Sequence, residues 1–360
     1  MKPYLWLFGA TMLFVTLIRF NILDQLIPTP GPGIYRARIV QVDSALESTK
    51  TGTQMIVAAI EDGPMVGSNV SIQHTLGGYN TDIIYALGNR IFISPAGQNQ
   101  GLFYIRGPVR DRSLMLLFAL FAFSLILIGG TQGMRALLSL AIICLLLFQV
   151  LLPSLAKGYH PFFISLAIVI IATFISLLLV SGWNGKTAAA ITGTISGLIT
   201  AGLLTWFFGN SSYLTGYADE TAQVLHYTAS FPVNFQGLLF AGIMIGALGA
   251  ITDMTMSIAS AVQEIKTSNP ALEYDALVAQ GLKVARDTIG TMTNTLVLAY
   301  VGGAFSLLLL FLSHRASLGW ILNLEEVATE MVRILAGSIG LIVAVPVTTA
   351  VAAITIKVER

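Results

Sequence analysis

The sequence predicts an α-helical polytopic membrane protein that carries a small β-rich domain outside the membrane. Three observations support this prediction. Of the 360 residues, 55% are apolar and only 10% are charged, whereas soluble domains carry about 25% charged residues. The apolar residues gather in stretches of roughly 20, the length that crosses a bilayer as a helix. One polar segment, residues 21–112, interrupts this pattern with short runs of β type.

The apolar stretches predict about eight transmembrane helices. They cover residues 4–20, 114–130, 136–152, 162–180, 187–208, 235–262, 289–312 and 331–356. No small-residue cleavage site follows the first stretch, so residues 1–20 are expected to remain as a membrane anchor. Residues 113–360 would then form a membrane domain of seven helices.

Basic residues in the short loops predict the orientation of the chain, because cytoplasmic loops are enriched in lysine and arginine. With the N-terminus inside, the cytoplasmic positions are Lys2, Arg135, Lys186, Lys266, Lys283, Arg286, Lys357 and Arg360, and the short external loops contain Lys157 and Arg315. We therefore expect both termini on the cytoplasmic side. This orientation places the polar segment on the external side.

The polar segment, residues 21–112, contains five short β-type runs with Gly-Pro and Gly-Gly pairs between them. The runs cover residues 34–42, 53–61, 69–76, 89–94 and 102–106. A small barrel or a sandwich would accommodate them, and an OB-like barrel is one option. The net charge of +1 and the lack of an aromatic platform beside a basic stripe argue against nucleic acid as a partner.

Residues 269–286 predict an amphipathic helix on the inner membrane surface. Asn269 and Pro270 suit the N-cap and the first position of a helix, and apolar residues recur at helical spacing from Tyr274 onward. Such a helix either faces lipid or packs as a connector between two spans.

The most informative stretch is residues 242–265, which is apolar and long enough to span a bilayer yet contains Asp253. Polar and small residues three or four positions apart share one face of the predicted helix: Gly242, Gly246, Gly249, Asp253, Ser257, Ser260 and Glu264. Contact of the acid with lipid would cost several kcal/mol. Asp253 is therefore expected in the protein interior or in a wet cavity, and the small residues would let another helix approach closely.

The next span places Asp287, Thr291 and Asn294 on one face. Because the two spans are antiparallel and a helix rises 1.5 Å per residue, Asn294 is expected at a depth comparable to that of Asp253. An ionisable group inside the membrane is a functional-site hypothesis, in which Asp253 binds a proton or a cation. Its polar neighbours would be Asn294, Thr291, Ser257, Ser260, Glu264 and Asp287. The alternatives are contact with a substrate and a structural hydrogen bond at a helix kink.

Other positions predict packing or solvent contact. The fifth and last spans have small residues on one face, the helix-packing positions Gly193, Gly197, Gly337 and Gly340. The external acids Asp219, Glu220, Glu325, Glu326 and Glu330 either attract cations or form a solvated loop face. The four histidines show no ligand spacing, and no nucleophile has a base nearby in sequence. The sequence therefore predicts no metal site, no cofactor and no enzymatic activity.

Three motifs occur in order along the membrane domain: GALGAITDMTMSIASAVQEI (residues 246–265), ARDTIGTMTNTLVLAYVGG (285–303) and RILAGSIGLIVAVPVTTAVAA (333–353). They resemble the YibE/F family of bacterial integral membrane proteins. The resemblance spans roughly residues 110–356 and implies a multi-pass protein of the bacterial cytoplasmic membrane. The anchor and the β-rich segment are similar to the YibE type, which implies a paired YibF-like membrane protein as a partner, with a homo-oligomer as the alternative.

The order of the Asp253 span, the Asn294 span and the last Gly-rich span is also similar, more weakly, to SecD/SecF and other RND-type membrane domains. That likeness and the buried acid favour a proton- or cation-coupled transporter, permease or translocation helper. The alternative is a non-transporting membrane scaffold or assembly factor that acts through its external β-domain. A partner-binding role would need the β-domain, whereas a coupling role would need Asp253.

Overall fold

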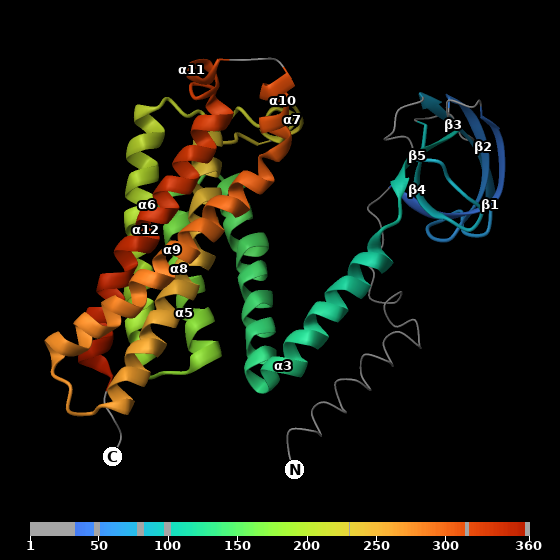
Figure 1. The fold of residues 1–360 in the computed structure, drawn as a ribbon. Coiled ribbons are helices and arrows are strands. Elements are labelled where there is room, and N and C mark those ends of the chain that lie inside the picture. Colours follow the sequence, from blue (N-terminus) through green and yellow to red (C-terminus); the bar gives the residue numbers. More distant parts are fainter. Residues whose placement is uncertain are drawn as a thin grey trace, which may run out of the picture. The chain divides into compact units, whose positions relative to one another are not determined.

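The computed structural model describes residues 33–46, 51–77, 83–96, 102–229, 231–313 and 317–356. The chain divides into two compact units, Met1–Gly130 and Thr131–Arg360, whose elements are labelled in Figure 1. The anchor predicted over residues 1–20 lies outside the described residues. Each unit has its own hydrophobic core.

The first unit contains the predicted β-rich domain as a five-stranded antiparallel sheet that curls into a barrel-like shape (Figure 1). The strands are β1 (Tyr35–Leu46), β2 (Thr51–Ile60), β3 (Asn69–Gly77), β4 (Arg90–Pro95) and β5 (Phe103–Pro108). They follow the order β3-β2-β1-β4-β5, and the two outer strands, β3 and β5, lie near each other. The sequence prediction of a small β-rich domain is confirmed.

The barrel core is formed by buried side chains that alternate with exposed ones along the strands. In β3, Val70, Ile72 and Leu76 are buried while the residues between them are exposed or half-buried, as expected when successive side chains point to opposite faces. Gln54 is also buried, and its amide donates to the Tyr85 carbonyl at 3.1 Å and accepts from the Tyr85 N–H at 3.0 Å. A buried amide is tolerated here because it has partners for its hydrogen bonds.

The helix α3 (Asp111–Leu146) continues through the π-turn η1 (Leu147–Leu151) into α4 (Leu152–Ala156). Together they form an apolar stretch of 46 residues, about twice the length that a bilayer requires. The helix is interrupted at Gly130, where φ is 55° and ψ is −129°. This backbone conformation is one that glycine adopts without the steric strain that a Cβ would cause.

The second unit is a helical bundle (Figure 1). Its long helices are α5 (Pro161–Ser181), α6 (Gly185–Ser211), α8 (Phe235–Ser268), α9 (Tyr274–Gly303) and α12 (Glu325–Thr355), and its short ones are α7 (Glu220–Thr228), α10 (Phe305–Ser313) and α11 (Leu318–Ile321). Within the described residues, five helices are long and apolar enough to cross a membrane, and the pair α9–α10, bent by 63°, adds a sixth. The sequence predicted eight spans.

The connection between α8 and α9 differs from the one predicted. The residues expected as a separate amphipathic helix, 269–286, do not form one: Asn269 is the C-cap of α8, and α9 begins at Tyr274. From there α9 runs without interruption to Gly303, because no proline or helix-ending turn occurs near residue 286. The break falls instead beside Ala304, before α10.

Helices α6 and α12 pack closely through glycine. A Cβ at Gly197 would lie 2.7 Å from the Gly340 carbonyl oxygen, and a Cβ at Gly340 would lie 2.6 Å from the Gly197 carbonyl oxygen. At Gly193 an added methyl group would overlap the side chain of Thr348. A Cβ at Gly337 would lie 3.4 Å from the Leu296 Cδ2 of α9. Small residues thus let the backbones approach, as in many membrane helix pairs.

Candidate functional site

The helix α8 begins at an N-cap, Asn234, whose side chain accepts a hydrogen bond from the Gly237 N–H at 2.8 Å. Its large apolar residues, including Ile243, Met244 and Ile251, are fully buried against the bundle. Between helices in a bilayer, contact is favoured by van der Waals packing rather than by removal from water, and these large side chains make more such contacts than glycine does. This difference decides which face of α8 is turned inward.

The opposite face of α8 contains the residues that the sequence analysis grouped as one stripe. Gly242, Gly246, Gly249, Asp253, Ser257 and Glu264 are exposed, and Ser260 is half-buried. At Gly242 and Gly249 no described atom outside the adjoining part of α8 lies within 4 Å of the position that a Cβ would take. We call this surface the Asp253 face of α8. It lies on the outside of the bundle, whereas the sequence analysis expected it in the interior.

Asp253 makes no hydrogen bond or ion pair with any described residue. It is the only acidic or basic residue of α8 before Glu264. The helix places it eleven positions beyond Gly242, a rise of about 16 Å. An uncompensated carboxylate at this level of a long apolar helix is the feature of the bundle that most needs a functional explanation.

The polar residues of α9 also lie on its outer face. Asp287, Thr291 and Asn294 are exposed, whereas Leu277, Gly281, Ala285 and Leu296 are buried. The Thr291 hydroxyl donates to the Thr288 carbonyl of its own helix at 3.0 Å. Asn294 makes no hydrogen bond with Asp253 within the described chain, so the pairing of these two side chains stays a prediction.

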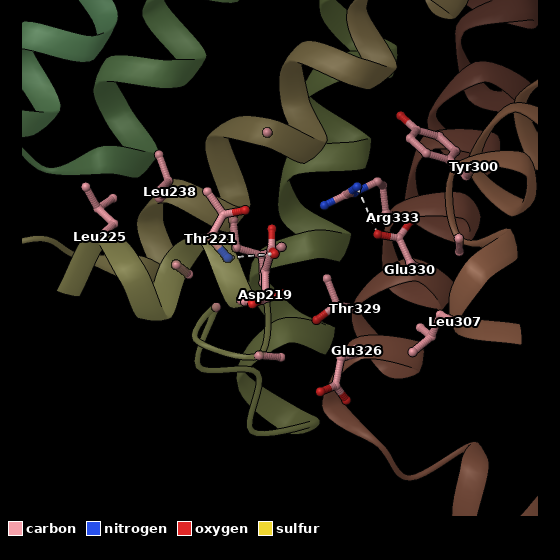
Figure 2. A pocket seen from close by; sticks show the side chains of 18 of the residues that line it. Asp219, Thr221, Leu225, Leu238, Tyr300, Leu307, Glu326, Thr329, Glu330 and Arg333 are labelled. Carbon is pink, nitrogen blue, oxygen red and sulfur yellow. Dashed lines mark hydrogen bonds and ion pairs between the residues drawn. The ribbon is translucent and has the colours of Figure 1, made fainter. Parts of the chain in front are cut away.

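A cavity of ≈ 610 Å³ opens at the end of the bundle that carries α7 and α10. Figure 2 shows side chains from α7, α8, α9 and α12 around it. Four acids line it, Asp219, Glu220, Glu326 and Glu330, together with Arg333 and Tyr300. Gly242 also lines the cavity, so the Asp253 face of α8 begins at its wall.

Three side chains form a connected group in this cavity (Figure 2). The Arg333 guanidinium lies 3.0 Å from the Glu330 carboxylate, one turn earlier on α12. The same guanidinium lies over the Tyr300 ring of α9, 5.7 Å from its centroid, within the range of a cation–π contact. A methyl group added at Gly246 would overlap the Tyr300 hydroxyl. Tyr300 therefore covers the Asp253 face of α8 immediately beyond the cavity.

The sequence analysis did not select Tyr300 or Arg333. The spacing of Glu330 and Arg333, three positions apart on a helix, is the pattern that could have indicated the ion pair. The contact with Tyr300 joins two helices and has no local pattern.

The acids that the sequence analysis grouped together have different roles. Asp219 caps α7 by accepting from the Thr221 N–H at 3.0 Å. Glu325 accepts hydrogen bonds from the N–H groups of Thr215 and Gly216 at 2.5 and 3.0 Å, and from the Thr215 hydroxyl at 2.8 Å. Glu325 thus links the loop before α7 to the start of α12.

In the part of the chain that the structure describes, no group of three His, Cys, Asp or Glu side chains could hold a metal ion.

We expect Glu325→Gln to lower the melting temperature of the detergent-solubilised protein. The amide keeps the shape of the side chain but loses the charge that strengthens three hydrogen bonds. One carboxylate oxygen is also replaced by an NH₂ group, which cannot accept a hydrogen bond from Thr215 or Gly216. A hydrogen bond to a charged group contributes about 1.5–3 kcal/mol, so a loss on the order of 1 kcal/mol is expected. Glu326→Gln is the matched control, because that carboxylate makes no hydrogen bond among the described residues. Equal melting temperatures for the two variants would contradict the assignment.

A sequence model of the YibE/F-like protein family matches residues 117–358. The chain belongs to the YibE/F-like family. The match covers every helix that lines the cavity and the whole Asp253 face of α8, so the site lies in the part that defines YibE/F-like membership. Comparison with curated proteins and with solved structures finds no match.

Proposed function

We propose that this YibE/F-like protein is a proton- or cation-coupled transporter, permease or translocation helper in which Asp253 binds the coupling ion. The observation that carries the proposal is the isolated carboxylate of Asp253, which has no partner in the described chain and lies on a face that begins at an acid-lined cavity. A fixed ion pair would hold the charge permanently. A carboxylate without a partner can exchange a proton or a cation instead.

The proposed mechanism is a change of charge at Asp253. Ion binding neutralises Asp253, and release restores the negative charge. Because a charge is costly in apolar surroundings, the two states favour different coverings of the α8 face by neighbouring helices. Substrate access on one side of the membrane would follow from that difference. Asn294 and Thr291 of α9, and Ser257 and Ser260 of α8, are its predicted polar neighbours on these two helices.

The proposed topology has eight crossings of the bacterial cytoplasmic membrane, with both termini inside. The helix over Asp111–Ala156 is long enough for two crossings, and the interruption at Gly130 supports two segments. Helices α5, α6, α8 and α12 and the pair α9–α10 supply five more, and the predicted anchor supplies the first. The cavity would then open on the external side.

The proposal assigns the external domain as an OB-like barrel that binds a partner rather than nucleic acid. The strand order β3-β2-β1-β4-β5, with β3 near β5, supports this assignment because OB folds are five-stranded, partly open barrels. The exposed Asp253 face of α8 supports a membrane partner, since lipid contact with the acid would be costly. A paired YibF-like protein or a second copy of this chain would cover it.

Ion flux in proteoliposomes tests the proposal. The purified protein is reconstituted with a pH-sensitive dye inside, and an inward proton gradient or a sodium gradient is imposed. We expect Asp253→Asn to abolish the ion movement that the natural protein catalyses, because the amide cannot exchange a charge. Asp275→Asn, which removes an exposed acid from the first turn of α9, should leave the flux unchanged. Equal flux in the Asp253→Asn variant and the natural protein would refute the coupling role.

A further inference from the structure

We propose that Tyr300, held by Arg333 and Glu330, is the gate between the cavity and the Asp253 face of α8. This inference rests on the proposed function only for the identity of what passes; the barrier can be measured without transport. It assigns a positioning role to Arg333 and Glu330, which act through Tyr300. The sequence patterns selected Glu330 only as one of several external acids, and they did not select Tyr300 or Arg333.

The proposed path runs along one face of α8. Gly242 lines the cavity, and Asp253 lies on the same face about 16 Å further along α8. The two positions between them on this face, Gly246 and Gly249, have no side chains. The face is therefore unobstructed by α8 itself, and any barrier along it must come from another helix.

In the described chain, Tyr300 lies over this face of α8 at the level of Gly246. The Tyr300 hydroxyl occupies the space where a Cβ of Gly246 would lie, whereas Gly242 and Gly249 have open space in the described chain. Tyr300 reaches this position from α9. We therefore expect removal of the Tyr300 ring to uncover the face of α8 between Gly242 and Gly249.

Weak contacts with Arg333 keep the Tyr300 ring in place. Its ring is held by one cation–π contact with Arg333, and Arg333 is paired with Glu330 at 3.0 Å with both side chains about a quarter exposed, at 27% and 26%. Contacts of this kind contribute roughly 0.5–2 kcal/mol. They are strong enough to favour one position of the ring and weak enough to be released when helices move.

Thiol labelling tests the gate. In a Cys144→Ser background, Gly242→Cys and Gly249→Cys each place one thiol before or beyond Tyr300, at positions where a side chain has room. A small cationic, membrane-impermeant methanethiosulfonate reagent is applied to cells and to inverted membrane vesicles. The side from which Gly242→Cys reacts is the side from which Gly249→Cys is then measured, so the assay is independent of the assumed orientation.

We expect Gly249→Cys to react about tenfold more slowly than Gly242→Cys, since a barrier of about 1.4 kcal/mol slows a rate tenfold. Tyr300→Ala should remove this difference, and Tyr300→Phe, which keeps the ring, should retain it. With Arg333→Gln, Gly249→Cys should react at a rate between those of the natural and the Tyr300→Ala backgrounds. This variant replaces Tyr300→Ala in the test if Tyr300→Ala does not fold. Leu298→Ala, which shortens an exposed side chain of the same helix, is the control and should change nothing.

Two results would overturn the gate. One is equal labelling of the two cysteines in the natural background, and the other is a labelling rate of Gly249→Cys that Tyr300→Ala and Arg333→Gln both leave unchanged. Asp253→Asn should not alter labelling at either position. A protein with a Tyr300-dependent labelling barrier but no flux would therefore refute the coupling role and keep the gate.

Discussion

Gly340→Ala is expected to destabilise the helical bundle strongly, because the new methyl group meets the backbone of another helix. The new Cβ would lie 2.6 Å from the Gly197 carbonyl oxygen and 2.9 Å from the Ala201 Cβ. The first of these atoms belongs to the backbone of α6, so two helices must move apart. Overpacking costs about 1–3 kcal/mol when side chains can adjust, and backbone contact leaves little room for adjustment.

The measurement is the melting temperature and the folded yield of the detergent-solubilised variant. Gly197→Ala should behave in the same way, because its Cβ would meet the Gly340 carbonyl oxygen at 2.7 Å. Gly209→Ala is the matched control on α6, where nothing lies within 4 Å and alanine is the better helix former by about 1 kcal/mol. Melting temperatures that fall equally for Gly209→Ala and Gly340→Ala would refute the close crossing of α6 and α12.

Selective modification by dicyclohexylcarbodiimide is the second large effect expected. This apolar reagent modifies protonated carboxyl groups and reacts poorly with ionised carboxylates in water. Asp253, on a long apolar helix and without a partner in the described chain, should be modified, and Asp275 and Glu273 at the start of α9 should not. Modification of Asp253 should decline as the pH rises, because the carboxyl group loses its proton.

Mass spectrometry of the digested protein locates the modified residue. If a metal cation is the coupling ion, sodium or potassium should protect Asp253 from modification at constant pH, and if a proton is the coupling ion, neither should. Any modification found in the Asp253→Asn variant must lie at other carboxyl groups, so this variant measures the background. A folded protein in which Asp253 stays unmodified at acidic pH, or in which Asp275 reacts equally, would contradict an exchangeable carboxylate at this site.

Local patterns were sufficient for the helices but not for their connections. Apolar stretches of the right length predicted α5, α6, α8 and α12, because hydropathy over about 20 residues is a property of neighbouring residues. The separate helix expected over residues 269–286 is the first part of α9, since helix continuity depends on the absence of a break rather than on a change of polarity. The asparagine and proline at 269 and 270 mark the end of α8 and the turn after it.

The inward face of α8 could not be decided from its own pattern. Periodicity divided the helix into a small, polar face and a large, apolar face, and either can contact another helix in a membrane. The structure buries Ile243, Met244 and Ile251 and leaves Asp253 outside, since the neighbouring helices offer complementary packing to the larger face. Helix α9 also turns a large apolar residue inward and a polar residue outward, with Leu296 buried and Asn294 exposed.

The sequence by itself determined the membrane class, the YibE/F-like family, the β-rich domain and the stripe that contains Asp253. These depend on composition, on short-range periodicity and on motifs within single segments. The tertiary structure alone decided that Tyr300 covers Gly246, that Arg333 joins Glu330 to Tyr300, and that Gly242 connects the cavity with the Asp253 face of α8. Each of these contacts joins or depends on segments tens of residues apart, and their distance is set by the packing of whole helices rather than by any local preference.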